Sequence, residues 1–277
     1  MFRSRFRLAL AGLGALAVLC VAYGWLVEPY WPQVTHTRIV SPRLAPGTAP
    51  VRLVLLSDMH SDPKPRLEER LPDLVAAQHP DLIVYAGDSI NTPRAVPVFK
   101  KCMSGLAKVA PTFAVRGNWD AWYWNRIDLF GGTGVRELDG DSAEVDVRGT
   151  RVWVGGVPIR HEDRVPALLA GLPENEPALF LYHYPYPDVL PDAQRGRIDL
   201  QCSGHTHGGQ VALPFYGAII TYSKYGKHYE SGLYTVGPSH LYVTRGVGLE
   251  GGIAPRVRFF ARPEITVVDL VPAAKGG

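Results

Sequence analysis

Cysteine is scarce in this sequence. The 277 residues include only three cysteines, which excludes a small scaffold held together by several disulfides. Cys20 lies within an apolar stretch, and Cys102 and Cys202 are too far apart in the chain to form the closely spaced pair of a thiolate metal site. These two can form a disulfide in an oxidising compartment, but we expect two buried free thiols.

Long basic runs are also missing. The formal net charge is only +3, and beyond the first few residues Lys and Arg are scattered along the chain. Nothing therefore indicates a nucleic-acid partner. The hydrophobic content of 46% and the charged content of 20% are typical of a globular protein with a sizeable core. The length suits one folded domain with an appendage.

Charge is absent from one long stretch near the N-terminus. Residues 8–27 contain no charged side chain, and this length is enough to cross a hydrocarbon core of about 30 Å. We interpret residues 1–28 as a transmembrane anchor or uncleaved signal, because the apolar part of a cleavable signal has only about 7–15 residues. A cleaved signal is the alternative. Arg3, Arg5 and Arg7 are expected on the cytoplasmic side, with the rest of the chain across the membrane.

Short apolar runs predict the fold class of the remaining chain. Residues 29–50 are rich in proline and are interpreted as a linker, and residues 51–271 as one domain. In that domain, runs rich in β-branched residues alternate with helical patterns at 67–78 and 99–106, where Pro72 implies a kink or a late helix start. We expect an α/β fold of two packed mixed β-sheets flanked by helices, the later runs forming the second sheet. The runs are 51–56, 82–86, 112–115, 152–154 and 178–182, then 241–244, 257–260 and 265–270.

Polar residues capable of binding metals stand where these runs end. A strand directs residues i and i+2 to the same face, so Asp58 with His60, and His205 with His207, can each converge on one site. In α/β sheets, ligands bind at the carboxyl ends of the strands. The sequence therefore predicts one site there. Its residues are Asp58, His60, Asp88, Asn118, His183, His205 and His207.

These motifs resemble the calcineurin-like metallophosphoesterase superfamily. The family pattern is Asp-x-His, Gly-Asp, Gly-Asn-His, a later His and Gly-His-x-His, and the match runs from about residue 51 to residue 210. Ser-Lys-Tyr-Gly near 223 and Arg-Pro-Glu-Ile-Thr near 262 resemble the small bacterial membrane-associated or exported branch. The resemblance implies an α/β/β/α sandwich and a metal-dependent hydrolase of phosphate esters or anhydrides, on the non-cytoplasmic side of the bacterial inner membrane.

The resemblance also implies a ligand set for two divalent metal ions. Asp58, His60 and His207 bind one ion, Asn118, His183 and His205 bind the other, and Asp88 bridges them; Asp88, Asn118 and His205 are the expected catalytic residues. Two cations about 3.5–4 Å apart need such a shared anionic ligand, and they activate a water for attack on phosphorus. Donors without thiolate suit manganese, iron or zinc, and manganese is our leading candidate.

Two features depart from the family or extend it. Trp119 replaces the histidine of Gly-Asn-His, which is thought to protonate the leaving group, and this loss should matter most for poor leaving groups. Asp120 or His161 is a candidate replacement, and Trp119 and Asp120 are expected substrate contacts. Aromatic residues crowd 119–124 and 215–229. They are either core residues or an interfacial surface at the lipid headgroups, where Lys224 and Lys227 would meet phosphates.

Three functions follow as hypotheses. The first is a two-metal phosphodiesterase or pyrophosphatase, acting on a phosphate-containing small molecule or a lipid-linked substrate near the membrane. The second resembles the UDP-diacylglucosamine pyrophosphatases of lipid A synthesis, although their substrate is used on the cytoplasmic face, opposite to the expected topology. The third is a noncatalytic binding module that retains its metals. The sequence leaves the oligomeric state open.

Overall fold

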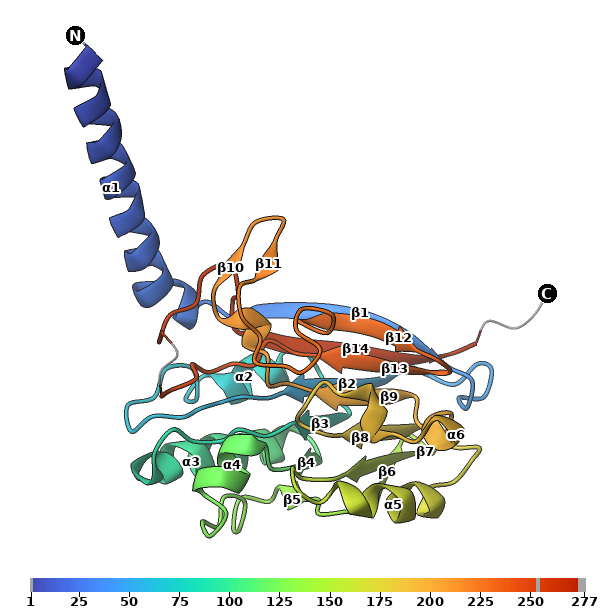
Figure 1. Cartoon of the computed structure of the whole chain (residues 1–277). Coiled ribbons are helices and arrows are strands. Elements are labelled where there is room, and N and C mark those ends of the chain that lie inside the picture. The colour runs from blue at the N-terminus through green and yellow to red at the C-terminus, as the bar shows by residue number, and fades with distance from the viewer. Residues whose placement is uncertain (1, 253–254, 274–277) are drawn as a thin grey trace.

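A long helix stands apart from the rest of the molecule. The computed structural model describes residues 2–252 and 255–273, and α1 (Phe2–Leu26) projects away from the domain (Figure 1). From Leu8 onwards the helix has no charged side chain and therefore no polar face to turn to water. Among the described residues, the stretch Arg5–Tyr30 is long and apolar enough to cross a membrane.

The first sheet carries the strands that lead to the predicted site. Its strands β2 (Val51–Leu56), β3 (Leu82–Tyr85) and β4 (Thr112–Ala114) run parallel, so their carboxyl ends meet at one edge. The strand order is β1 (Gln33–Ser41), β14 (Glu264–Pro272), β2 (Val51–Leu56), β3 (Leu82–Tyr85), β4 (Thr112–Ala114) and β5 (Arg136–Glu137).

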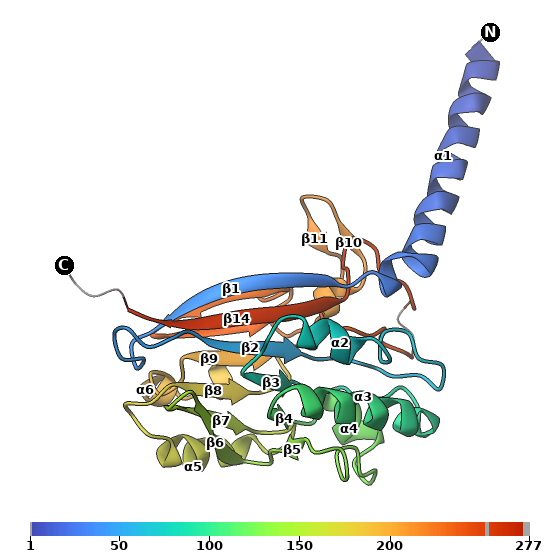
Figure 2. The same cartoon turned by 180° about the vertical axis from the view of Figure 1, so that it is seen from behind.

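The second sheet packs face to face on the first. Leu53 and Val84 of the first sheet share a buried apolar core with Val154 and Leu181 of the second, and Figures 1 and 2 show the two sheets one behind the other. The strand order is β12 (Gly232–Val236), β13 (Ser239–Val243), β9 (Leu200–Ser203), β8 (Ala178–Leu181), β7 (Thr150–Gly156) and β6 (Asp141–Val147).

Helices cover the outer faces of both sheets. Phe99 and Met103 of α3 (Val96–Val109) pack with Ile83 and Tyr85 of the first sheet, and Leu168 of α5 (Val165–Gly171) packs with Phe180 of the second. Figure 2 shows α2 (Leu71–Ala76) and α3 in front of the first sheet. The predicted α/β class with two packed sheets is confirmed. The helices are α2 (Leu71–Ala76), α3 (Val96–Val109), α4 (Asn118–Tyr123), α5 (Val165–Gly171) and α6 (Asp192–Arg195), with short 3-10 turns at Glu28–Tyr30, Pro93–Ala95, Glu162–Arg164, Pro187–Val189 and His207–Gly209.

The interpretation of residues 29–50 as a linker is wrong for their central part. Residues 33–41 form β1, which pairs in parallel with β14 from Gln33 opposite Glu264 to Ser41 opposite Pro272. Pro32 and Pro42 flank this strand instead of interrupting it, so no ladder hydrogen bond is lost within it. The folded domain therefore begins before residue 51.

The later strands also differ from the prediction. Residues 241–243 do join the second sheet, but the run 265–270 lies in β14 of the first sheet, antiparallel to β2. Residues 257–260 form no strand and make only an isolated bridge between Phe259 and Val211. Of the two alternatives that Pro72 implied, a kink or a late helix start, the structure has the late start, since α2 begins at Leu71. Cys102 and Cys202 are buried free thiols, as expected.

Candidate metal centre

Loops after parallel strands of both sheets deliver the predicted site residues. Asp58 and His60 follow β2, Asp88 follows β3, and Asn118 opens α4 just after β4. His183 follows β8 of the second sheet, and His205 and His207 follow β9. The site thus lies where the carboxyl edges of the two packed sheets meet, which is where parallel sheets bind ligands.

The backbone of these loops is held in an uncommon conformation. Asp58, His60, Asp88, His205 and His207 all have positive φ angles, of 52°, 39°, 60°, 74° and 52°. A residue with a side chain rarely occupies this region, and such conformations concentrate at functional sites because surrounding contacts must maintain them. Here the tight turns direct the side chains towards one point.

Two compact groups of potential ligands result. Ligand atoms of Asp58, His60 and His207 lie within 4.8 Å of one another, and so do those of Asp58, Asp88 and His183. Oδ2 of Asp88 is 3.5 Å from Nε2 of His60 and 3.4 Å from Nε2 of His183. The Asp88 carboxylate therefore lies between an imidazole from each sheet. Its other oxygen, Oδ1, accepts a hydrogen bond of 2.8 Å from the backbone N–H of Trp119.

Several buried polar atoms in this cluster lack hydrogen bonds. Nε2 of His60, Nε2 of His183 and Oδ1 of Asn118 are buried and have no hydrogen-bond partner among the described residues. Buried polar groups are nearly always paired, so each exception calls for a missing partner. Carboxylate, amide and imidazole donors in this arrangement suit divalent metal ions such as manganese, iron or zinc.

Contacts on the far side of the rings fix their orientation. Nδ1 of His183 lies 2.7 Å from the carbonyl oxygen of Ala86, and Nδ1 of His60 lies 3.1 Å from Oδ1 of Asn91. With Nδ1 donating to these oxygens, Nε2 of each ring is the nitrogen left to bind a metal in the cluster. Such outer contacts are typical of histidines that bind metals.

Comparison with known proteins identifies the family of this chain. Residues 51–209 match the model of the family described as calcineurin-like phosphoesterase. The chain belongs to this family. It is therefore a metal-dependent phosphoester hydrolase, and the superfamily expected from the motifs is confirmed.

Relatives cover nearly the whole phosphoesterase chain. It is 31% identical to the metallophosphoesterase YkuE of Bacillus subtilis over 98% of both chains, and 32% identical to the phosphodiesterase YaeI of Escherichia coli over 88% of this chain and 90% of that one. A transmembrane protein with metallophosphoesterase domain from Danio rerio is 29% identical over 97% of this chain and 64% of its own length.

Burial and neighbouring charges shift the pKa values of the ionisable groups in the phosphoesterase site. Burial alone would raise the pKa of Asp88, but the imidazoles of His183 and His60 outweigh this effect and hold that pKa well below its ordinary value. Burial opposes charge on His183 as well, yet the Asp88 and Asp58 carboxylates raise its pKa to about 9. Burial, reinforced by His183, lowers the pKa of His205 to about 3. In the metal-free protein, a proton on His183 thus offsets part of the buried negative charge.

His205 lies at the edge of the cluster. The Asn118 side chain is buried, whereas His205 is half-buried and lies outside the two compact groups, with its ring centroid 5.3 Å from that of His183. Nε2 of His205 is 3.3 Å from the carbonyl oxygen of Tyr222, which leaves Nδ1 for the cluster. The backbone N–H of His205 donates to both carboxylate oxygens of Asp58 at 3.1 Å.

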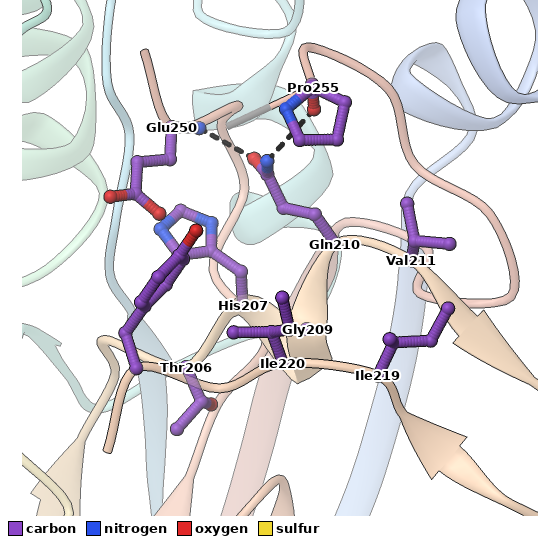
Figure 3. A pocket seen from close by; sticks show the side chains of 10 residues that line it. Thr206, His207, Gly209, Gln210, Val211, Ile219, Ile220, Glu250 and Pro255 are labelled. Carbon is purple, nitrogen blue, oxygen red and sulfur yellow. Dashed lines mark hydrogen bonds between the residues drawn. The ribbon is translucent and has the colours of Figure 1, made fainter. Parts of the chain in front are cut away.

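Two cavities open beside the cluster, and both have largely apolar walls. One of about 560 Å³ is lined by Trp119, His205 and neighbouring aromatic rings. The other, of about 230 Å³, has His207 at its base and Ile220 in its wall (Figure 3). Tyr222 and Glu250 line both, so a substrate in either cavity reaches the same centre.

The expectation that Asp120 contacts substrate is wrong. Asp120 is completely buried, and its carboxylate accepts hydrogen bonds from the backbone N–H groups of Asp88, Ser89 and Gly117 at 2.9–3.0 Å. Neither Asp120 nor His161 lines the two cavities, and His161 instead pairs with Asp139 at 2.6 Å. Asp120 therefore holds the loops that carry Asp88 and Asn118. Neither residue is placed to replace the missing histidine.

Trp119 lines the larger cavity. Its ring is edge-on to His60, with centroids 5.0 Å apart, and Glu250 lines the same cavity. Glu250 was missed by the sequence reasoning, although it lies in a glycine-rich stretch that follows β13, a parallel neighbour of β9. Gln210 fixes this stretch through a hydrogen bond from the Glu250 backbone N–H at 2.6 Å (Figure 3).

Proposed function

We propose that this protein is a membrane-anchored, two-metal phosphodiesterase or pyrophosphatase that acts on a lipid-linked or membrane-proximal substrate. The position of Asp88 between His60 and His183 carries the two-metal part of this proposal. The name of the relative YaeI, a phosphodiesterase, supports the choice of a diester over a monoester. The apolar walls of both cavities favour a substrate with an apolar or aromatic substituent.

The metals are assigned to residues as the motif implies. Asp58, His60 and His207 hold one ion, Asn118, His183 and His205 hold the other, and Asp88 is shared. Support for Asp88 as the shared ligand comes from its Oδ2, which is within 3.5 Å of both imidazoles. Asp58 is less evenly placed, since its Oδ1 is 3.4 Å from Nε2 of His207 but 4.0 Å from Nε2 of His183.

The chemistry divides between the ions and the chain. When bound, two divalent ions activate a water for attack on phosphorus and neutralise charge on the phosphoryl oxygens, manganese being our leading candidate. The chain orients the ligands through Ala86, Asn91 and Asp120, and Trp119 and Tyr222 help to exclude water from the site. With Trp119 in place of a histidine, no imidazole protonates the leaving group there, so substrates with good leaving groups are preferred.

Helix α1 is proposed to span the bacterial inner membrane once, with the catalytic domain on the non-cytoplasmic side. The apolar stretch Arg5–Tyr30 and the transmembrane relative from Danio rerio support the span. The arginines at positions 3, 5 and 7 support the orientation. This topology counts against a UDP-diacylglucosamine pyrophosphatase, whose substrate is used on the cytoplasmic face.

Steady-state hydrolysis by the full chain in detergent tests the proposal. The protein is loaded with manganese, zinc or iron and supplied with an aryl phosphomonoester, an aryl phosphodiester or a nucleotide pyrophosphate. We expect turnover of the diester or pyrophosphate that Asp88→Asn abolishes and that the control Asp269→Asn retains, because Asp269 pairs with Arg52 away from the cluster. If folded, metal-loaded protein hydrolysed none of the three, the noncatalytic binding module would become the better hypothesis.

A further inference from the structure

A small hairpin projects from the domain on the same side as α1. Strands β10 (Ala212–Leu213) and β11 (Gly217–Ala218) form it, and Figures 1 and 2 both show it rising beside the helix. Its exposed side chains are almost all apolar or aromatic. They are Leu213, Phe215, Tyr216, Ile219 and Ile220, with Phe215 exposed to 111% of its reference area.

In water, burial of apolar side chains does not stabilise the conformation of this hairpin. Phe215 has a φ of 65°, which is strained for a bulky residue. Only two residue pairs join the strands, so the hairpin has no interior to bury its apolar side chains. Contiguous exposed apolar side chains mark a binding surface for a protein or a membrane.

Backbone hydrogen bonds and a ring contact link the hairpin to α1. At its base, the backbone N–H of Ala212 donates to the carbonyl oxygen of Phe259 at 2.8 Å. The adjoining Arg258 backbone N–H donates to the carbonyl oxygen of Gly24 in α1 at 2.9 Å, and the Phe259 ring is edge-on to Tyr23 at 6.2 Å. The hairpin and the end of α1 are therefore linked through Arg258 and Phe259.

The end of α1 presents the same kind of surface. Trp25, Trp31 and Phe260 are exposed there, and the Arg262 guanidinium lies 4.1 Å from the centre of the Trp31 ring. At the hairpin, Nζ of Lys227 from the following loop lies 3.4 Å from the centre of the Tyr216 ring. Aromatic rings beside long cationic side chains are characteristic of the headgroup region of a bilayer.

We propose that residues 213–220 insert into the headgroup region of the same bilayer that α1 spans. This inference rests on the proposed anchoring by α1. A lipid surface fits better than a protein partner, because the hairpin continues the aromatic and cationic surface at the end of the helix. Insertion gives the domain a second attachment and fixes its orientation. Since Ile219 and Ile220 also line the cavity above His207 (Figure 3), the bilayer then adjoins the metal centre through an apolar wall.

Site-directed labelling of the full chain in vesicles of phosphatidylcholine and phosphatidylglycerol tests the insertion. The background is Cys20→Ala, which leaves only the buried Cys102 and Cys202. Phe215→Cys carries a polarity-sensitive fluorophore, and Glu144→Cys is the matched control. Glu144 is exposed and belongs to β6, a strand on the side of the domain away from α1 (Figures 1 and 2). We expect lipid-borne nitroxide to quench the label at 215 severalfold more than the label at 144, with iodide showing the reverse order.

A second variant tests whether the apolar tip drives this contact. A label at Leu213→Cys should be quenched by the nitroxide, and adding Phe215→Asp should remove most of that quenching. If the protein floated with the vesicles but iodide quenched the labels at 215 and 144 equally, the proposed insertion would be overturned. The proposed membrane anchor would still stand. Protein that did not float would overturn the anchor, and the insertion with it. Turnover of the aryl diester by the same preparations reports separately on the proposed activity, because Phe215 lines neither cavity.

Discussion

Asp88 Oδ2 lies 3.4 Å from His183 Nε2, and this contact joins the two sheets. Asp88 follows β3 of the first sheet, and His183 follows β8 of the second. The centre therefore exists only when the sheets are packed together. Ions bound there would link the carboxyl edges of both sheets, so metal occupancy and stability of the fold should be coupled.

Metal removal should lower the thermal stability of the protein. A ligand that binds only the folded state at about 100 times its Kd stabilises that state by about 2.7 kcal/mol. We expect a chelator to lower the Tm of the wild type and of Asp269→Asn, but to change that of Asp88→Asn much less. Thermal unfolding with and without chelator measures this, and an equal response of all three proteins would contradict the assigned site.

Metal affinity should rise with pH up to about pH 9. Ligation needs a neutral imidazole, whereas the Asp88 and Asp58 carboxylates overcome burial and raise the pKa of His183 to about 9 in the metal-free protein. Below that pH the metal must displace a proton, so affinity should increase about tenfold per pH unit. Calorimetric titration in buffers of different ionisation enthalpy should detect release of about one proton at pH 7. Binding without proton release would contradict this protonation state.

Trp119→His should broaden the substrate range. It restores an imidazole at the position where the family pattern has one, and general acid catalysis typically contributes about 10²–10⁴ in rate. We expect kcat/KM for alkyl phosphodiesters to increase towards that range, with little change for aryl phosphodiesters. Trp119→Phe, which keeps a ring without the acid, is the control. A similar gain in both variants would show that cavity size, and not proton donation, limits the alkyl substrates.

Asp120→Asn should destabilise the fold and weaken metal binding together. The variant loses charge-assisted hydrogen bonds from the N–H groups of Asp88, Ser89 and Gly117. Loss of such buried partners costs about 1–3 kcal/mol. Chemical denaturation and metal titration measure the two effects. The exposed Asp163→Asn should change neither, and an Asp120→Asn protein of normal stability would contradict the supporting role of this carboxylate.

The orientation of α1 is open to a direct test. The three arginines before the apolar stretch keep the N-terminus in the cytoplasm, so the C-terminus should lie on the other side of the membrane. Alkaline phosphatase fused to the C-terminus should therefore be active, and green fluorescent protein fused there should not fluoresce. Replacing Arg3, Arg5 and Arg7 by Gln should weaken this preference. A fluorescent fusion in the wild type would place the domain in the cytoplasm and favour the UDP-diacylglucosamine pyrophosphatase hypothesis.

The sequence by itself determined the features that depend on local pattern. A long stretch without charged residues is enough to identify α1. The apolar runs that stop shortly before Asp58, Asp88 or His183 mark strand ends, because the length of a strand and the alternation of its side chains are properties of neighbouring residues. The same alternation predicted that His205 and His207 would follow one strand. The α/β class and the family followed from these local signals and their order.

Only the tertiary structure decided which distant segments lie together. Pairing of β1 with β14, and of β14 with β2, depends on contacts between segments far apart in the chain, and no local pattern specifies those partners. Side-chain direction in loops was equally undetermined, because it depends on backbone angles that surrounding packing imposes. Asp120 therefore turned to the backbone, Glu250 entered the site, and the apolar hairpin came to lie beside α1.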